Sequence, residues 1–408
     1  MLMNAPFLQR CLDYPRLKAP PYRILLLESG YFTVAECKKG LEKLGHKVIL
    51  LPLGGDFIKR LLLHMVEVKP DFLLTINHLG FDEEGKLTSL LTELKLPFAS
   101  WFVDSPSYII YKNDRQVSDF CSLFSWERSY LPRMEEQGFN SPVFLPLATD
   151  PDIFRPADSS SLPRFTADIA FVGNSMTELN RKWEKKIPPG IIGKFSSLAL
   201  AAQFAERRKP MRDILEELGV DSEASGLIEI EAAMVWKATQ EYRKKLACSL
   251  LPLGLVTYGD SGWKGLLPCC QGLRPEVDYY RELPLVYNST KINVNATSFQ
   301  MNSAVNQRVF DSAACGGFLL TDHQADMDLF FEPGKDAVSF ESPEEAVELA
   351  GYYLKHEKER EAIALAARKT VLSEHTYDRR MAALVSVMAG KFGSNMQSTH
   401  LALAGNLG

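Results

Sequence analysis

Residues 23–51 read RILLLESGYFTVAECKKGLEKLGHKVILL and contain the pattern that decides the fold. The apolar run at residues 23–27 predicts a short buried strand, and Ser29-Gly30 predicts a turn. Apolar residues then recur at helical spacing as far as Gly45, and residues 48–51 predict a second strand. A strand, a helix and a further strand in this order are typical of a parallel sheet covered by helices.

The same alternation continues through both halves of the chain. Further strands are expected at residues 72–76, 98–103, 168–172, 255–258, 291–295 and 318–320. Helical patterns separate most of these strands. We therefore expect an α/β protein with two parallel sheets, each covered by helices on both faces.

A proline-rich stretch divides the chain. Residues 145–156 read LPLATDPDIFRP, and a polar run follows at residues 157–161. This composition is typical of a linker, so we expect one domain over residues 1–156 and a second over residues 157–376. Within the second domain, residues 180–250 lack a strand signal and predict a helical insertion. The insertion forms a partner-binding or homodimer surface, a lid, or a helical cover for the sheet.

Composition and charge exclude several classes of protein. The 408 residues are 46% hydrophobic and 24% charged, which suits two packed soluble domains. A net charge of −5 provides no general field for binding nucleic acid, so we expect no nucleic-acid partner. No apolar run near the amino terminus is long enough for a transmembrane segment or signal sequence, and we expect a cytoplasmic location. The seven cysteines lack zinc-site spacing, and Cys269-Cys270 is either a redox pair or two indifferent thiols.

A predicted helix around residues 304–314 begins directly after a polar loop. Val305, Val309 and Ala313 can face the sheet, which leaves Asn306 and Arg308 near the start of the helix. Free N–H groups and the positive end of the helix dipole favour an anion there, and Arg308 can add a charge-assisted pair with a phosphate. The same spacing also suits a capped helix with a purely structural role.

Several motifs occur in a defined order along the chain. They are NHLGF at residues 77–81, WFVDSP at 101–106, LPLA-x-DP-x2-F-x-P at 145–156, YG-x3-W at 258–263, NQRVFD-x3-CGG-x3-TD at 306–322, PGKD at 333–336 and EHTY-x2-R at 374–380. These motifs resemble those of the CgeB-type, or spore-maturation-like, glycosyltransferases of the group-one superfamily. The resemblance implies the GT-B fold, in which two Rossmann-like domains face each other across a cleft. It also implies that a helix over residues 377–392 crosses back to the first domain, whereas residues 393–408 predict a disordered tail.

The resemblance implies a transferase that moves a hexosyl-type sugar from a nucleotide sugar to an acceptor. The donor binds mainly to the second domain and the acceptor approaches the first, usually without a metal. We expect no metal or other cofactor besides the nucleotide-sugar co-substrate, linked to UDP or GDP, and a glycan or protein acceptor of the cell-surface polysaccharide or flagellin type. The alternatives are a nucleotide-sugar epimerase, which the same fold supports, and a non-catalytic module that binds nucleotide sugars or glycans.

In the second domain, the expected donor-binding residues follow the strands. Gly173 and Asn174 approach the diphosphate or form a plain turn, and Lys291 is either a second cation or a solvated strand end. Backbone N–H groups near Asn306 and the Arg308 side chain are the main candidates for the phosphates.

Tyr258 and Gly259 let the backbone approach the nucleotide base. Trp263 stacks on the base or walls its pocket, or it is an ordinary packing residue. Asp311 can accept hydrogen bonds from ribose hydroxyls, whereas Ser303 stands where related transferases have an acidic residue. The donor-sugar contact is then made differently, or by Asn306.

In the first domain, three loops follow strands at the same predicted edge of the sheet. Gly30 and Tyr31 follow the first strand, Asn77 and His78 a later one, and Asp104 the strand after that. Because ligands bind at the carboxyl ends of parallel strands, we expect these residues on the acceptor side. Asp104 or His78 would be the general base of transfer, although Asp104 can equally organise the turn that follows.

Overall fold

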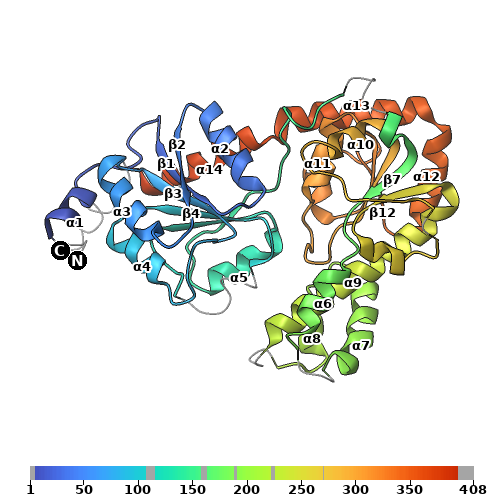
Figure 1. Cartoon of the computed structure of the whole chain (residues 1–408), viewed down its shortest axis with the longest axis horizontal. Coiled ribbons are helices and arrows are strands. Elements are labelled where there is room, and N and C mark those ends of the chain that lie inside the picture. Colours follow the sequence, from blue (N-terminus) through green and yellow to red (C-terminus); the bar gives the residue numbers. More distant parts are fainter. Residues whose placement is uncertain are drawn as a thin grey trace, which may run out of the picture. The chain divides into compact units, whose positions relative to one another are not determined.

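The computed structural model describes residues 5–106, 115–157, 163–187, 191–221, 226–269 and 271–393. Cys270, most of the polar run 157–161 and, from residue 394 on, the expected disordered tail lie outside the described residues. The chain divides into two compact units, each described by itself (Figure 1). Unit 1 contains Met1–Leu147 and Tyr377–Gly408, and unit 2 contains Ala148–Thr376.

The boundary lies before Ala148, whereas the linker prediction placed it after Pro156. The proline-rich segment lacks regular structure, but its apolar side chains pack within unit 2. Phe154 is buried, and its ring centroid lies 5.3 Å from that of Tyr279. Buried aromatic packing therefore assigns the second half of the expected linker to unit 2.

Unit 1 is built on a six-stranded parallel sheet with the order β2-β1-β3-β4-β5-β6. The strands are β1 (Arg23–Glu28), β2 (Lys47–Pro52), β3 (Phe72–Ile76), β4 (Phe98–Phe102), β5 (Cys121–Ser125) and β6 (Val143–Phe144). The described helices include α1 (Ala5–Leu12), α2 (Thr33–Lys43), α3 (Phe57–Glu67), α4 (Lys86–Glu93), α5 (Leu131–Glu136) and α14 (Tyr377–Phe392). Strands β3, β4 and β5 are buried along their whole length, as a parallel sheet covered on both faces requires.

Helix α14 is part of unit 1, although all of unit 2 precedes it in the sequence. It packs closely on α2, where a Cβ on Gly40 would lie only 3.0 Å from Met381 Cγ. The Arg380 guanidinium donates a hydrogen bond of 2.8 Å to the Pro146 carbonyl oxygen. These contacts attach the last helix to the body of unit 1.

Unit 2 contains a second six-stranded parallel sheet, with the order β12-β11-β10-β7-β8-β9. The strands are β7 (Ala167–Val172), β8 (Leu255–Tyr258), β9 (Leu273–Arg274), β10 (Thr290–Asn295), β11 (Leu319–Asp322) and β12 (Val338–Phe340). The described helices include α6 (Thr177–Glu184), α7 (Ile191–Ala205), α8 (Met211–Glu217), α9 (Leu227–Leu250), α10 (Leu283–Ser289), α11 (Gln307–Ala314), α12 (Pro343–Lys355) and α13 (Glu357–Glu374). The prediction of two parallel sheets covered by helices is confirmed.

The helical insertion contains α6 to α9, and α9 is central to unit 2. Figure 1 shows α6, α7 and α8 in a lobe at one end of this unit, from which α9 runs back to the sheet. Apolar residues of α9, among them Met234, Ala238 and Leu246, are buried in the same core cluster as Ile169 of β7. Burial of this face stabilises α9 against the sheet. None of the described helices combines the length and the apolar character needed to span a bilayer.

Candidate functional site

The turns after β7 and β8 pack directly on each other at the carboxyl edge of the unit 2 sheet. The indole Nε1 of Trp263 donates a hydrogen bond of 2.8 Å to the Gly173 carbonyl oxygen. A Cβ on Gly259 would lie 2.6 Å from the same Nε1, so this close approach requires glycine. Trp263 is fully buried and packs edge-on against Phe171. Trp263 therefore has the packing role and does not stack on a nucleotide base, since a buried ring offers no face for a base.

Asp260 fixes the geometry of these turns. Its Oδ2 accepts a hydrogen bond of 2.7 Å from the Ser175 amide, and its Oδ1 accepts one of 2.8 Å from the Gly262 amide. Tyr258, the last residue of β8, is buried and packs against Phe165. Sequence reasoning expected the base near Tyr258 and did not single out Asp260, although an aspartate that caps a short turn is a recognisable signal.

Helix α11 begins at Gln307, later than the predicted helix, because Asn306 is its N-cap. The Oδ1 of Asn306 accepts a hydrogen bond of 3.1 Å from the Arg308 amide. Its Nδ2 donates one of 3.1 Å to Oδ1 of Asn295, the last residue of β10. The Asn306 amide group is thus used within the fold, and the contact with the donor sugar expected of it is not supported. The cap does hold the start of α11, and with it Arg308, at the carboxyl edge of the sheet.

Arg243, on α9, is the residue of this edge that sequence reasoning missed. Only 4% of Arg243 is exposed, and its Nη1 donates a hydrogen bond of 2.9 Å to the Asn174 carbonyl oxygen. Its buried Nε has no hydrogen-bond partner in the part of the chain that the structure describes. Burial and, to a lesser extent, the nearby positive charge of Arg308 lower the pKa of Arg243 to about 9, whereas Asp260 acts in the opposite direction.

The two guanidinium groups lie close enough to repel each other. Among the described residues, no carboxylate lies within ion-pair distance of Arg243 or Arg308. A buried cation beside a second cation is costly unless an anion binds to it. The carboxyl edge of unit 2 therefore carries an unneutralised pair of arginines next to Asn174 and the start of α11. We call these two residues the arginine pair.

The structure places Lys291 at the opposite end of the sheet. Lys291 is near the start of β10, and its Nζ forms an ion pair of 2.7 Å with Asp168, near the start of β7. Both side chains are more than half exposed. In parallel strands the amino ends share one edge, so Lys291 cannot reach the arginine pair. The prediction of Lys291 as a second phosphate-binding cation is therefore wrong, and the alternative of a solvated strand end holds.

The Asp311 carboxylate is also committed within the fold. Its Oδ1 accepts a hydrogen bond of 2.7 Å from the Thr149 hydroxyl, and its Oδ2 accepts one of 2.7 Å from the Tyr279 hydroxyl. Asp311 is 1% exposed. A contact between Asp311 and ribose is not supported, because both carboxylate oxygens already bind hydroxyls of unit 2.

A carboxylate does lie beside Ser303, the position where related transferases have an acid. The Ser303 hydroxyl donates a hydrogen bond of 3.2 Å to Oδ2 of Asp326, and the Asp326 amide donates one of 3.0 Å to the Ser303 carbonyl oxygen. Asp326 belongs to the short 3-10 helix Ala325–Leu329. The sequence could not reveal this neighbour, because the two residues meet only through folding.

The acceptor-side residues predicted in unit 1 come together at the carboxyl edge of its sheet. Tyr31 follows β1, Asn77 follows β3 and Asp104 follows β4. The Tyr31 hydroxyl donates to Asp104 Oδ2, and Asn77 Nδ2 donates to the same oxygen at 3.1 Å. Burial and the Asp104 charge raise the pKa of Tyr31 well above its usual value, so Tyr31 remains a donor. Gly30 precedes Tyr31 with a φ of 72°, a backbone conformation that favours glycine.

His78 is brought to the same edge but is not exposed there. It is 2% exposed, its Nε2 lies 3.2 Å from Oε1 of Gln116, and its ring stacks on Phe81. Burial lowers the pKa of His78 to about 4, so its neutral form dominates at neutral pH. We therefore do not retain His78 as a general base, because its buried ring cannot contact an acceptor directly.

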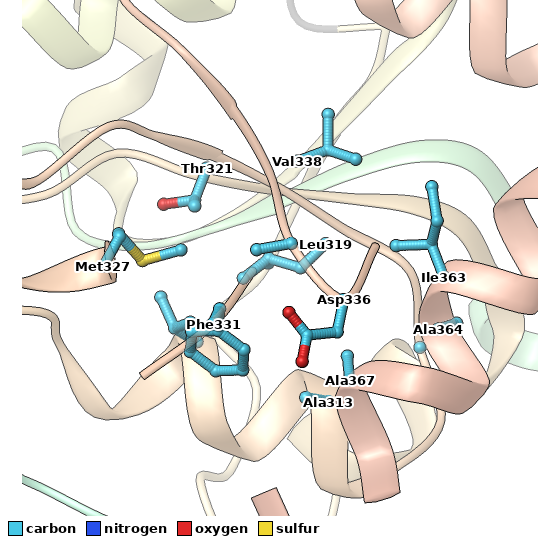
Figure 2. A pocket seen from close by; sticks show the side chains of 13 residues that line it. Ala313, Leu319, Thr321, Met327, Phe331, Asp336, Val338, Ile363, Ala364 and Ala367 are labelled. Carbon is cyan, nitrogen blue, oxygen red and sulfur yellow. The ribbon is translucent and has the colours of Figure 1, made fainter. Parts of the chain in front are cut away.

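A small internal cavity lies beneath α11 in unit 2. It has a volume of about 20 Å³ and is lined mainly by apolar side chains. Figure 2 shows Leu319 and Thr321 of β11, Val338 of β12 and Ile363 of α13 around it. Such a cavity holds at most a water molecule and is far too small for a nucleotide. Within the described residues, no group of three or more His, Cys, Asp or Glu side chains is arranged to bind a metal ion.

Comparison with known proteins finds a family model and a curated relative that match part of the chain. Residues 234–386 match the family model described as "Glycosyl transferase-like". Spore protein CgeB of Bacillus subtilis (strain 168) is 30% identical over 116 residues, which cover 27% of this chain and 35% of CgeB. The chain thus matches about a third of the length of this curated relative.

Two solved structures are similar to this chain in structure. A glycosyltransferase from Rickettsia africae ESF-5 has a TM-score of 0.55 at 13% identity, covering 92% of this chain and 100% of that one. Anabaena Alr3699/HepE, in complex with UDP and glucose, has a TM-score of 0.49 at 10% identity, covering 90% and 100%. The resemblance found in the sequence motifs is confirmed: the chain has the GT-B fold, is similar to CgeB over 116 residues, and matches the glycosyl transferase-like model at residues 234–386.

Proposed function

We propose that the protein is a glycosyltransferase that moves a sugar from a nucleotide sugar to a hydroxyl group of a glycan or protein acceptor. Unit 2 binds the donor, and unit 1 supplies the acceptor side. The observation that carries this proposal is the unneutralised arginine pair, Arg243 and Arg308, at the carboxyl edge of a parallel sheet. The match to the glycosyl transferase-like model, which covers both arginines, supports the assignment.

The diphosphate is the group that best suits the arginine pair. Glycosyl transfer breaks the bond between the sugar and the diphosphate, so negative charge grows on the departing phosphate. Two guanidinium groups and the free N–H groups at the start of α11 stabilise that charge. Because Arg243 is buried and held by the Asn174 carbonyl, it is oriented before the ligand arrives. We propose that this positive edge, and no metal ion, stabilises the leaving group.

The acceptor hydroxyl needs a proton acceptor if the reaction inverts the anomeric centre. Asp104 is partly exposed and receives hydrogen bonds from Asn77 and Tyr31. A carboxylate oriented in this way suits a general base, which takes the hydroxyl proton as the oxygen attacks the sugar. We propose Asp104 as that base, with Asn77 and Tyr31 as the residues that orient it.

The donor sugar remains to be placed, and we propose that the turn at Ser303 lies next to it. Asp326, which accepts a hydrogen bond from Ser303, supports this view, since it supplies a carboxylate at the position where related transferases use an acid. The hexosyl type, the nucleotide base and the acceptor belong to the same proposal, with UDP- and GDP-sugars as the first donors to test.

Turnover of the donor tests the proposal. The full chain is screened by thermal shift against UDP-, GDP-, CMP- and dTDP-sugars, and each donor that binds is then incubated with and without candidate acceptors. Release of nucleoside diphosphate that depends on the acceptor supports a transferase. A changed sugar that remains on the nucleotide would identify an epimerase instead. Tight binding without turnover would identify a non-catalytic binding module.

A further inference from the structure

An open cavity of unit 2 lies beside α9, away from the arginine pair. It has a volume of about 860 Å³ and is formed by α9, the chain after α7 and the start of α12. Neither residue of the arginine pair lines it, nor does Asn174. The volume is within the range of about 300–1,000 Å³ that is typical of small-molecule sites. We call this cavity the α9 groove.

The charges of the α9 groove are balanced. Its lining includes three basic and three acidic side chains: Arg207, Lys244, Lys245, Glu241, Glu341 and Glu344. The Lys245 ammonium pairs with Glu344 at 3.1 Å, and the Lys244 ammonium lies 3.9 Å from Glu241. The three carboxylates would repel a bound anion, and the three basic groups would repel a bound cation. Charge therefore favours a neutral ligand that can both accept and donate hydrogen bonds.

An exposed aromatic ring forms part of the wall. Phe204 is 44% exposed, and its ring packs edge-on against Phe299 at 5.7 Å between centroids. The Tyr242 ring also packs edge-on against Phe299, and the Arg207 guanidinium lies 4.1 Å from the Tyr242 ring centroid. A large apolar side chain left in solvent inside a polar cavity is a surface on which a ligand with an apolar face can pack.

Arg207 and Tyr242 form a fixed part of this wall. The Arg207 guanidinium interacts with the Tyr242 hydroxyl, and Arg207 is held in place by its ion pair with Asp322 at the end of β11. The exposed polar groups of the groove are instead the side chains of Glu241, Lys244, Lys245 and Glu344. Together they offer both donors and acceptors to a hydroxyl-rich ligand.

We propose that the α9 groove binds a neutral saccharide, separately from the donor at the arginine pair. A sugar ring has an apolar C–H face, which packs on Phe204, and hydroxyl groups, which hydrogen-bond to the exposed Glu241 and Lys244. The groove thus holds a glycan on unit 2 while the donor occupies the arginine pair. This inference does not depend on catalysis, because it concerns binding alone.

Isothermal titration calorimetry of the full chain with three neutral tetrasaccharides, maltotetraose, cellotetraose and chitotetraose, tests the proposal. We expect at least one of them to bind, and Phe204→Ala to weaken it about tenfold. Leu198→Ala, which removes another exposed side chain of α7 outside the groove, is the matched control and leaves binding unchanged. Glu241→Gln is a second groove variant on the exposed side of α9, so the test does not depend on Phe204→Ala folding correctly.

The arginine site provides the discriminating arm. Arg243→Gln is expected to leave tetrasaccharide affinity unchanged, and UDP in excess is expected not to displace the saccharide. Loss of saccharide binding in Arg243→Gln, or displacement by UDP, would place the saccharide at the donor site and overturn the proposal. The proposal would also be overturned if none of the tetrasaccharides bound at millimolar concentration. It would likewise be overturned if inorganic pyrophosphate bound more strongly than the tetrasaccharides and its binding depended on Phe204 and Glu241.

Discussion

The side-chain amide of Asn77 clamps Asp104 from two sides. Its Nδ2 donates a hydrogen bond of 3.1 Å to Asp104 Oδ2, and its Oδ1 accepts bonds from the amides of Val103 at 2.8 Å and Asp104 at 3.1 Å. Asn77 is buried and has a φ of 52°, a left-handed conformation that asparagine tolerates better than most residues. A short side chain in an unusual conformation thus fixes both the backbone and the carboxylate of the proposed base.

Replacing Asp104 tests its role directly. We expect Asp104→Asn to lower kcat by about 10²- to 10⁴-fold, because the amide cannot accept the acceptor's proton, while donor affinity stays unchanged. The measurement is acceptor-dependent release of nucleoside diphosphate, with donor Kd from calorimetry. Retained transfer would make Asp104 a structural residue.

Asn77→Asp tests whether Asn77 positions the Asp104 carboxylate or only supports the fold. A second carboxylate beside Asp104 disfavours its charged form and raises its pKa. The acid limb of the kcat–pH profile should therefore move to higher pH, whereas Asn77→Ala should lower kcat without that displacement. An unchanged profile in folded Asn77→Asp would argue that Asp104 is not the titrating base.

The arginine pair predicts a linked loss of donor affinity. Arg243→Gln and Arg308→Ala should each weaken nucleoside diphosphate binding by about 1–3 kcal/mol, or about fivefold to 150-fold in Kd. Because the two cations share one anion, their losses should not simply add in the double variant. Calorimetry with UDP and GDP measures all three variants.

Lys291→Ala is the matched control for the arginines, since it removes a cation from the opposite edge of the same sheet. Its nucleotide affinity should equal that of the unchanged protein. If Lys291→Ala weakened binding as much as Arg243→Gln did, the arginine pair would not be the phosphate site.

The sequence predicted the sheets well because buried parallel strands leave a strong local signal. The runs at β1 and β3 are mainly apolar, and the loops after β1, β3 and β4 meet as strand direction requires. Only one residue of the arginine pair could be predicted from the sequence. Arg308 follows from a helix start, whereas Arg243 lies within a long helix whose polar face has no local signature of a ligand site.

The predictions for Lys291 and Asp311 failed for the same physical reason. The spacing of residues along the sequence does not show which groups a side chain contacts in the folded protein. Lys291 belongs to a predicted strand of the second sheet, but only the register with β7 shows that its partner is Asp168 at the amino edge. Asp311 occupies the expected helical position, but the segment after Ala148 brings the Thr149 hydroxyl to it. Both outcomes depend on contacts between segments far apart in the sequence.

His78 predicts a pH dependence of stability. In the unfolded chain histidine has a pKa of about 6.5, whereas burial lowers the pKa of His78 to about 4 in the folded protein. Above pH 6.5 both states are neutral. As the pH falls below 6.5 the unfolded state binds the proton first, so the free energy of unfolding falls, by about 2 kcal/mol at pH 5.

Urea unfolding of the protein and of His78→Asn at about pH 7 and about pH 5 measures this effect. Asparagine tolerates the φ of 56° at this position and does not titrate. The difference in unfolding free energy between the two proteins should shrink or reverse at the lower pH. Parallel pH dependence in both would show that His78 is not the buried neutral group described here.

Asp311 predicts a loss of stability without a loss of donor binding. Asp311→Ala leaves the hydroxyls of Thr149 and Tyr279 without their acceptor, and Thr149 is fully buried. An unsatisfied buried donor costs about 1–3 kcal/mol, so the melting temperature of unit 2 should fall, while Asp311→Asn, which keeps one acceptor oxygen, should cost less. Nucleotide affinity, measured well below the melting temperature, should be the same in both variants. A tenfold weaker Kd for UDP in folded Asp311→Asn would restore the ribose contact that the present hydrogen bonds argue against.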